Sequence, residues 1–466
     1  MSNVTLVVAI VLLLLALLAM RMPVAFALGF SGAVGLALLR DFSFATNMLG
    51  SIPFDETARF TLTIIPMFIL MGMFAMKAKM AEQVYAVAAH VFAKLPGGLG
   101  VATVMACAGF AAVSGSSIGT TATMSKLSVG EMRKHGYPDS LATATVAMAG
   151  TLGVLIPPSI ILVLYAIMTG ESVAKVLAAG ILPGILTAIA FAVFIMLIAP
   201  KHVARQKELN QALAAAAEPI VPGSGGTAVL TAVEQLAPPA PTRLRDLPMR
   251  GLVRVAILFF IVLGGMYSGL FTPTESAAVG ALAAGIMLFL EMWREGWKAT
   301  ISAAVEALKE TAGTTSMVFS IIVGSAVLSI FFVAAKVPQM LTAAVVEANM
   351  NPHLTIGLLL LTLLPLGMAL ESISILVITV PLLYPVAMEL GFDGIWLGIL
   401  IVKLIEIGMV TPPVGIQCFV VAGTSGVRVS TIFRGVMPFV IVELIVVAIL
   451  FAFPQIILWL PSLVTF

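Results

Sequence analysis

The chain has 466 residues, of which 61% are hydrophobic and only 10% are charged. About a quarter of the residues of a soluble domain are charged, so this composition excludes a soluble protein, which would lack the polar surface that keeps it in solution. The net charge of +2 gives no support for nucleic-acid binding, since no basic stripe with interleaved aromatic residues accompanies it. Several stretches exceed about 18 apolar residues with few charges, which predicts an all-α polytopic membrane protein in the lipid bilayer.

The first half of the chain, residues 1–200, begins with an apolar run that has no Lys or Arg before Arg21. A secretory signal needs a basic region ahead of its apolar core and a small-residue cleavage site, and neither is evident. We therefore interpret this run as the first membrane span. The spans of this half are expected near residues 5–20, 23–39, 61–77, 84–94, 101–124, 140–168 and 174–199.

A polar segment from Ser114 to Thr121 interrupts the apolar stretch at residues 101–126. Non-helical backbone at membrane depth is tolerated only where protein buries it or where it lines a wet cavity. We therefore predict a re-entrant helical hairpin, the first hairpin, whose tip offers the hydroxyl oxygens of Ser114, Ser116 and Ser117.

A Pro-Pro pair breaks the next apolar stretch, residues 140–168. Proline has no N–H, so Pro157 and its neighbour leave the carbonyls of Gly153 and Val154 without their helical partners. The residue before the pair, Ile156, is pushed towards an extended conformation, so its carbonyl also turns away from the helix. Hard cations prefer oxygen ligands, so these carbonyls and the hairpin serines together predict a cage for a monovalent cation.

A new half-helix is expected to begin after this break, at Ser159. The free N–H groups at its N-terminus attract an anion, typically a carboxylate, without the need for a formal charge. Ser159 is therefore a candidate substrate contact, and local capping of the half-helix is the alternative role of its hydroxyl.

A polar insert, residues 201–250, separates the two halves. Lys and Arg cluster at both of its ends, and its middle is rich in Gly and Pro, which is typical of a flexible or extended linker. The positive-inside rule places this insert in the cytoplasm. We expect most of it to be a spacer without chemistry of its own.

The second half, residues 251–466, repeats the landmarks of the first. Pro412-Pro413 follows Pro157-Pro158 by 255 residues, and Gly435 follows Gly180 by the same offset. We therefore predict one module written twice, since interrupted hydrophobic segments in corresponding positions of two halves indicate the binding site of a secondary transporter. The spans of this half are expected near residues 251–270, 275–291, 300–333, 339–346, 354–388, 394–424 and 430–462, with the second hairpin at 354–388 and the second broken helix at 394–424.

The second break should free the carbonyls of Gly408 and Met409, and Thr411 should be extended because it precedes the proline pair. Together with Ser372 of the second hairpin, Thr411 adds hydroxyl oxygens, which predicts a second cation cage. The half-helix after this break is expected to begin near Val414. Because Val414 stands where the first half has a serine, we expect the first break to serve ion and substrate and the second mainly the ion.

Glu371 is the one acidic residue between Glu347 and Glu389, in an otherwise apolar stretch. An intramembrane carboxylate is costly and by default indicates function. Glu371 can bind substrate hydroxyls or an amine, complete a cation cage or carry a proton, and a structural role is the alternative. Glu406 is a weaker candidate, which can instead pair with Lys403 one turn back.

A membrane enzyme is the rival from another class, and a purely structural scaffold would not need two matched helix breaks. The four histidines are scattered, and no HExxH, CxxC, GxSxG or Gly-rich Lys-Ser/Thr phosphate loop occurs, so we expect no catalytic residues, no cofactor and no metal besides the coupling ion. Cys107 and Cys418 lie in apolar surroundings and are expected as small core residues without a disulfide. A standalone two-hairpin carrier for dicarboxylate or citrate is the closer alternative, but its Asn/Thr-rich hairpin signature is missing.

Several motifs resemble the large membrane subunit of tripartite ATP-independent periplasmic (TRAP) transporters, and the likeness covers nearly the whole chain apart from the insert. The motifs are Ser-Gly-Ser-Ser from Ser114, Gly-Tyr-Pro from Gly136, Gly-Thr-Leu-Gly-Val-Leu-Ile-Pro-Pro-Ser from Gly150 and Gly-Met-Val-Thr-Pro-Pro-Val-Gly from Gly408. The resemblance implies sodium-coupled uptake of a small organic acid, such as a C4-dicarboxylate, sugar acid or keto acid, delivered by a soluble periplasmic binding protein. It also implies a bacterial inner-membrane location, inverted repeats, an elevator motion and a small four-helix membrane partner, which we expect as a separate chain.

Carried over motif by motif, the resemblance also implies the site residues. The family's substrate site falls on Ser116, Ser159 and Glu371, where the family often has the shorter Asp in place of Glu371. Its sodium sites fall on the two hairpin tips and the two breaks, that is on Ser114, Ser116, Ser117, Gly153, Val154, Ile156, Pro157, Ser372, Gly408, Met409, Thr411 and Pro412.

Overall fold

The computed structural model describes residues 3–216, 248–340, 343 and 350–464, and within these residues the secondary structure is helical, with no strand. The helices of the first half are α1 (Asn3–Ala19), α2 (Val24–Leu39), α3 (Phe42–Thr57), the 3-10 helix η1 (Phe60–Thr63), α4 (Ile64–Lys77), α5 (Met80–Val91), α6 (Gly98–Ser114), α7 (Ser117–Lys134), α8 (Asp139–Gly150), α9 (Leu152–Leu155), α10 (Ile160–Thr169) and α11 (Val173–Ala216).

The helices of the second half follow a similar order. They are α13 (Met249–Phe259), the π-helical turn η3 (Phe260–Gly264), α14 (Gly265–Tyr267), α15 (Pro273–Met292), the 3-10 helix η4 (Trp293–Glu295), α16 (Trp297–Ala334), α18 (Pro352–Leu361), α19 (Leu363–Ala369), α20 (Ser372–Glu389), α21 (Gly394–Val410), α22 (Ile416–Ser425), α23 (Val429–Ala452) and α24 (Gln455–Ser462).

Length and composition confirm the polytopic membrane class. Eight helices of the described chain are long and apolar enough to cross a bilayer, or up to nine when the bent pair α8–α9 with α10 is taken as one span. Helices satisfy their own backbone hydrogen bonds, which is why a chain this apolar folds as helices rather than as open sheets in lipid. Cys107 and Cys418 are buried free thiols, as expected.

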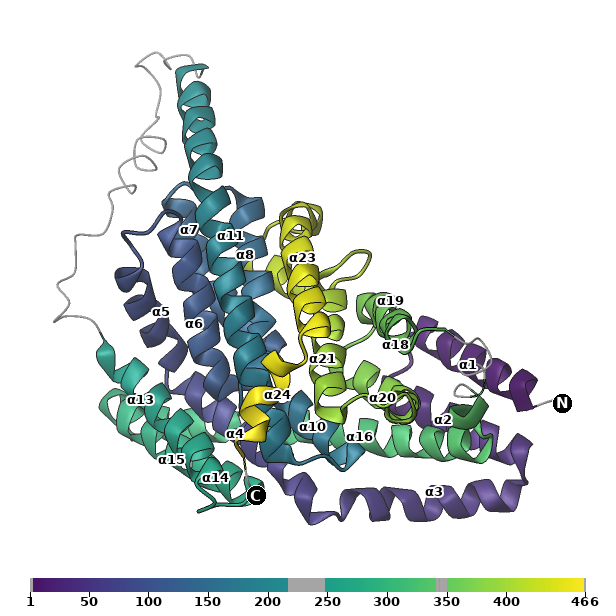
Figure 1. Cartoon of the computed structure of the whole chain (residues 1–466). Helices are drawn as coiled ribbons and strands as arrows, with labels where there is room; N and C mark the ends of the chain where they lie inside the picture. Colours follow the sequence, from purple (N-terminus) through teal and green to yellow (C-terminus); the bar gives the residue numbers. More distant parts are fainter. Residues whose placement is uncertain (1–2, 217–247, 341–342, 344–349, 465–466) are drawn as a thin grey trace, which may run out of the picture.

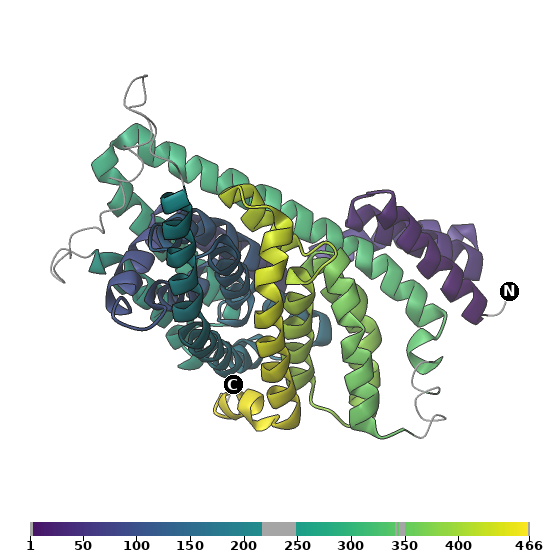
Figure 2. The ribbon, with the colours of Figure 1, turned by 90° about the horizontal axis from the view of Figure 1, so that it is seen from above.

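A frame of helices lies along one side of the molecule. The long α16 runs across its whole width and packs against α2, α3 and α4, while α15 packs against α4 (Figure 2). Lys77 at the end of α4 donates to Glu306 and Glu310 of α16, each at 2.9 Å, which fixes α4 against α16. One helix beside this frame, α3, was not among the predicted spans. Asp41 caps α3 by accepting a hydrogen bond from the Phe44 N–H at 2.7 Å.

A second group of helices forms the packed bundle beside this frame. It contains α6 to α11 together with α21 and α23 (Figure 1). Lys403 of α21 and Glu443 of α23 form a fully buried ion pair, and Lys403 also donates to the Thr187 hydroxyl of α11 at 2.7 Å. The alternative role of Glu406, a pair with Lys403, is not realised, because the Lys403 side chain turns to its neighbours on α23 and α11.

The two hairpins enter the bundle from opposite ends of α11. Gly136, which follows α7 of the first hairpin, lies beside Lys207 near the C-terminal end of α11. Tyr384 of α20, in the second hairpin, donates to Glu171 at 2.9 Å, and Glu171 immediately precedes α11. The hairpin tips therefore approach the middle of the bundle from opposite sides.

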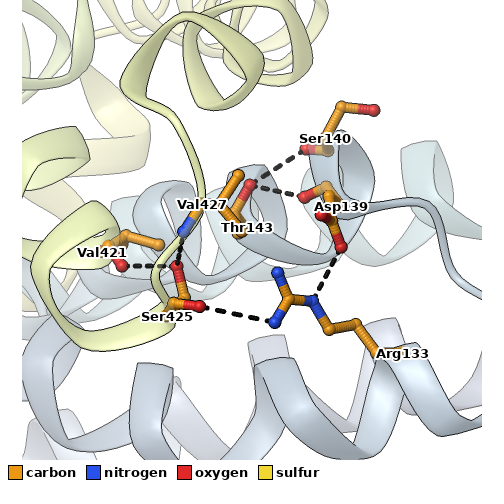
Figure 3. A network of polar contacts seen from close by, with 7 residues as sticks. All are labelled: Arg133, Asp139, Ser140, Thr143, Val421, Ser425 and Val427. Carbon is orange, nitrogen blue, oxygen red and sulfur yellow. Dashed lines mark hydrogen bonds and ion pairs between the residues drawn. The ribbon is translucent and has the colours of Figure 1, made fainter.

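The first hairpin is also tied to the second broken helix at its base (Figure 3). Arg133, in the last turn of α7, donates to the Asp139 carboxylate at 2.7 Å and to the Ser425 carbonyl at the end of α22 at 3.4 Å. The Ser425 hydroxyl in turn accepts from the Val427 N–H at 3.3 Å. The bond between Arg133 and Ser425 connects segments that are 292 residues apart in sequence.

The insert differs from its prediction at its start. Helix α11 continues through residues 201–216, so the insert begins as a helix. This part is rich in Ala and also contains Leu, Gln and Lys, which favour a helix even where the apolar run has ended. The Gly- and Pro-rich segments that carried the linker prediction, within residues 217–247, lie outside the described residues.

Candidate functional site

The tip of the first hairpin is a sharp turn between α6 and α7. Gly115 adopts a left-handed conformation with a φ of 61°, which glycine tolerates best. Ser116 caps α7 by accepting a hydrogen bond from the Gly119 N–H at 3.2 Å, and Ser114 shares a 2.6 Å hydrogen bond with the Thr120 hydroxyl. The tip therefore gathers hydroxyl oxygens at the turn between two buried helices.

The first break lies directly against this tip. Ile156 is extended, with φ −78° and ψ 121°, and the peptide bond between Pro157 and Pro158 is cis. A Cβ atom at Gly153 would lie 2.7 Å from the Ser116 carbonyl oxygen, so only glycine allows this approach. The break and the hairpin tip thus meet backbone to backbone, which brings Gly153 and Ser116 of the predicted first cage together.

Ser159 begins the next half-helix, α10, as predicted, and its hydroxyl accepts a hydrogen bond from the Leu162 N–H at 3.3 Å. It is fully buried. Its hydroxyl therefore caps α10 in this conformation, and Ser159 is absent from the lining of the cavity described below.

The second hairpin and the second break repeat this arrangement with different residues. Thr411 is extended, with φ −91° and ψ 140°, and its hydroxyl donates to the Ile407 carbonyl at 2.6 Å. A Cβ atom at Gly408 would lie 2.5 Å from the Cα of Gly367 on α19, so here two glycines form the contact. The half-helix begins at Ile416 rather than near Val414, since the residue before it, Gly415, is left-handed.

A cavity of about 300 Å³ lies between the two hairpin tips and the frame helices α4 and α16. Ser116 and Ser117 of the first tip and Glu371 and Ser372 of the second all line it, and α4 and α16 close it with Met73 and Met317 among others. Residues of the first break also line it, whereas those of the second break do not. The structure therefore places two of the three predicted substrate residues, Ser116 and Glu371, in one cavity.

Three helices begin at this cavity. The first residues of α7 and α20, Ser117 and Ser372, and those of α10, Ile160 and Ile161, line it. The lining contains no Lys or Arg. Because N-termini of helices carry partial positive charge and free N–H groups, the cavity can hold an anion without a cationic side chain.

Glu406, the weaker candidate in the sequence, contacts both hairpin tips. It lies in α21 and is 1% exposed, and its Oε1 accepts hydrogen bonds from Ser372 at 2.9 Å and Ser117 at 3.3 Å. Its Oε2 accepts from the Gln417 amide of α22 at 2.7 Å. Its place two residues before Gly408 was visible in the sequence, but only the fold brings both hairpin tips to it.

The fold and this cavity define a class of protein: a multi-pass membrane transporter with two hairpins that meet two broken helices. Residues 11–456 match the family described as the tripartite ATP-independent periplasmic transporter, DctM component. The chain belongs to this family, so it is a transporter subunit of the bacterial inner membrane rather than an enzyme. The word tripartite implies two further components.

Named relatives agree with this assignment. The chain is 34% identical over 436 residues to the C4-dicarboxylate TRAP transporter large permease protein DctM of Pseudomonas aeruginosa, covering 93% of each chain. It is 31% identical over 455 residues to the sialic acid TRAP transporter large permease protein SiaM of Vibrio cholerae, covering 96% of this chain and 97% of the relative. In fold, it is similar to the YdaH transporter of Alcanivorax borkumensis, with a TM-score of 0.63, 14% identity and coverage of 93% and 97%.

Proposed function

We propose that this permease carries a small organic acid into the cell, coupled to sodium ions, by an elevator movement of the bundle against the frame. The substrate is a carboxylate of the C4-dicarboxylate, sugar-acid or keto-acid type. The convergence of three helix N-termini on a cavity without Lys or Arg carries this proposal. The relatives named for C4-dicarboxylate and for sialic acid are carboxylate transporters, which supports the same substrate class.

In this proposal the carboxylate of the substrate faces the N-termini of α7 and α10, because the carboxylate of Glu371 already stands at the N-terminus of α20. Ser116 and Glu371 contact the rest of the molecule, since both line the cavity, and Ser159 acts through the N-terminus of α10 that it caps. Glu371 would accept hydrogen bonds from substrate hydroxyls. A second carboxylate on the substrate therefore has to lie away from Glu371.

Two cages of neutral oxygens hold the coupling sodium ions. The close contact of Gly153 with the Ser116 carbonyl supports the first cage, and the contact of Gly408 with Gly367 supports the second. The elevator movement is supported by the position of the cavity, which lies where the hairpins of the bundle meet frame helices α4 and α16. The opposite directions of the two hairpins support inverted repeats.

The proposed partners are a soluble periplasmic binding protein, which delivers the acid, and a small four-helix membrane subunit. Uptake into proteoliposomes that hold all three components tests the proposal with candidate acids, with and without a sodium gradient. We expect uptake only with the binding protein and only with inward sodium. Uptake that ignores sodium would remove the coupling, and uptake without a binding protein would favour a standalone dicarboxylate or citrate carrier.

A further inference from the structure

Glu406 contacts the first residue of a helix in both hairpins. Ser117 is the first residue of α7 and Ser372 is the first residue of α20, and both hydroxyls donate to the same Oε1 atom, at 3.3 Å and 2.9 Å. Gln417 of α22 holds the other oxygen at 2.7 Å, and its own carbonyl accepts from Thr121 of α7 at 3.3 Å. One carboxylate thus joins both hairpins to the helices on either side of the second break.

The charge of Glu406 has no cationic partner among the ion pairs of the described residues. Lys403, one turn earlier on α21, is occupied by Glu443 and Thr187. The three neutral donors, Ser117, Ser372 and Gln417, give the carboxylate hydrogen bonds, but they do not balance its charge. A buried carboxylate without a cation is expensive, so when the protein works it either takes up a proton or has a positive charge beside it.

The geometry of the serine hydroxyls connects this charge to the predicted cages. A serine hydroxyl has one hydrogen to donate and two lone pairs. Because Ser117 and Ser372 donate their hydrogens to Glu406, their lone pairs remain available to a cation, although the Ser372 oxygen also contacts the Met409 sulfur. Each of these serines belongs to a different predicted cage, so a single carboxylate orients one ligand in both.

We propose that Glu406 is the positioning residue of both sodium cages: it orients the Ser117 and Ser372 lone pairs towards the ions and supplies the buried charge that attracts them. This inference rests on the proposed sodium coupling. The first half has no counterpart of Glu406, so one residue serves both halves. The position 255 residues earlier is Thr151, whose hydroxyl donates a hydrogen bond to the Met148 carbonyl at 2.7 Å. The two halves therefore differ at this position, where the second has a carboxylate and the first a hydroxyl.

Sodium-dependent thermal stabilisation of the purified protein in detergent tests the inference without transport. The unfolding midpoint is followed against sodium chloride, with choline chloride keeping the ionic strength constant. Glu406→Gln keeps the shape of the side chain but removes its charge. We expect the sodium concentration that gives half of the rise in unfolding midpoint to increase at least about tenfold, since the ion loses its attraction to the carboxylate. The matched control is the double variant Lys403→Met with Glu443→Gln, which removes an equally buried glutamate on α23 together with its cation and should leave the sodium concentration at half effect unchanged.

Two further variants keep the test decisive if Glu406→Gln does not fold. Ser117→Ala and Ser372→Ala each remove one donor and one proposed ligand, and each should weaken sodium binding while leaving a folded protein. An unchanged sodium dependence in Glu406→Gln, or in both serine variants, would overturn the role of Glu406 while sodium coupling stands. A wild-type protein that sodium does not stabilise and whose uptake ignores sodium would instead remove the proposed function itself.

Discussion

Replacing Gly408 by Ala tests whether the second hairpin is seated by direct backbone contact. The new Cβ atom would lie 2.5 Å from the Gly367 Cα and 2.8 Å from the Leu364 carbonyl oxygen, where ordinary contact begins at 3.4 Å. Both neighbours are backbone atoms, so no side chain can move aside, and α19 must retreat by about 1 Å. Overpacking of this kind lowers the free energy of unfolding by about 1–3 kcal/mol. The better helix propensity of Ala on α21 offsets about 0.5–1 kcal/mol of this loss.

We therefore expect a net loss of about 1–2 kcal/mol, seen as a fall of about 2 °C in the thermal midpoint of the purified protein. The retreat of the hairpin should also lengthen the 2.9 Å hydrogen bond from Ser372 to Glu406 and so weaken the sodium dependence of the midpoint. Gly423→Ala is the matched control, because this glycine of α22 has open space around its missing Cβ, and here the midpoint should stay or rise. Equal midpoints for the two variants would refute the seating of the hairpin on Gly408.

Three other substitutions or treatments have expected outcomes. Glu443→Ala should destabilise the protein by about 3–5 kcal/mol because it leaves the Lys403 ammonium buried without a partner, and adding Lys403→Met should recover most of the loss of thermal midpoint. Ser159→Ala should cost about 1 kcal/mol through the lost cap of α10, and Ser159→Thr should restore most of it, so a midpoint that Ala leaves unchanged would contradict the cap. Cys107 and Cys418 should resist a membrane-permeant maleimide in the native protein and react once detergent or heat unfolds it, because both thiols are buried.

The breaks of the transmembrane helices were predictable because their cause is local. A proline pair removes N–H donors wherever it stands, so the extended conformations of Ile156 and Thr411 followed from the sequence. The hairpin tip at Gly115 was predictable for a related reason, since a polar run inside an apolar stretch cannot face lipid. These features need no knowledge of the partner helices.

The contacts between distant segments were not predictable in the same way. The sequence left two roles open for Glu406, and the local one, a pair with Lys403, is not realised because α23 and α11 supply Glu443 and Thr187 as partners of Lys403. The helix α3 was missed because its polar residues give it no strong apolar run. Helix α11 was ended too early, since the apolar run ends at Pro200 whereas helix-favouring residues continue beyond it.

The asymmetry between the two repeats has a physical consequence for coupling. Glu406 accepts from both hairpins, which enter the bundle from opposite ends, so a displacement of either tip changes the hydrogen bonds available to the other. If the proposed cages hold sodium, an ion in one cage would draw a lone pair of its serine inwards and keep the hydrogen of that serine on Glu406, which would favour the geometry of the second cage. Two cages that share one carboxylate should therefore bind sodium cooperatively, with occupancy of one favouring occupancy of the other, even though their own oxygen atoms come from separate halves of the chain.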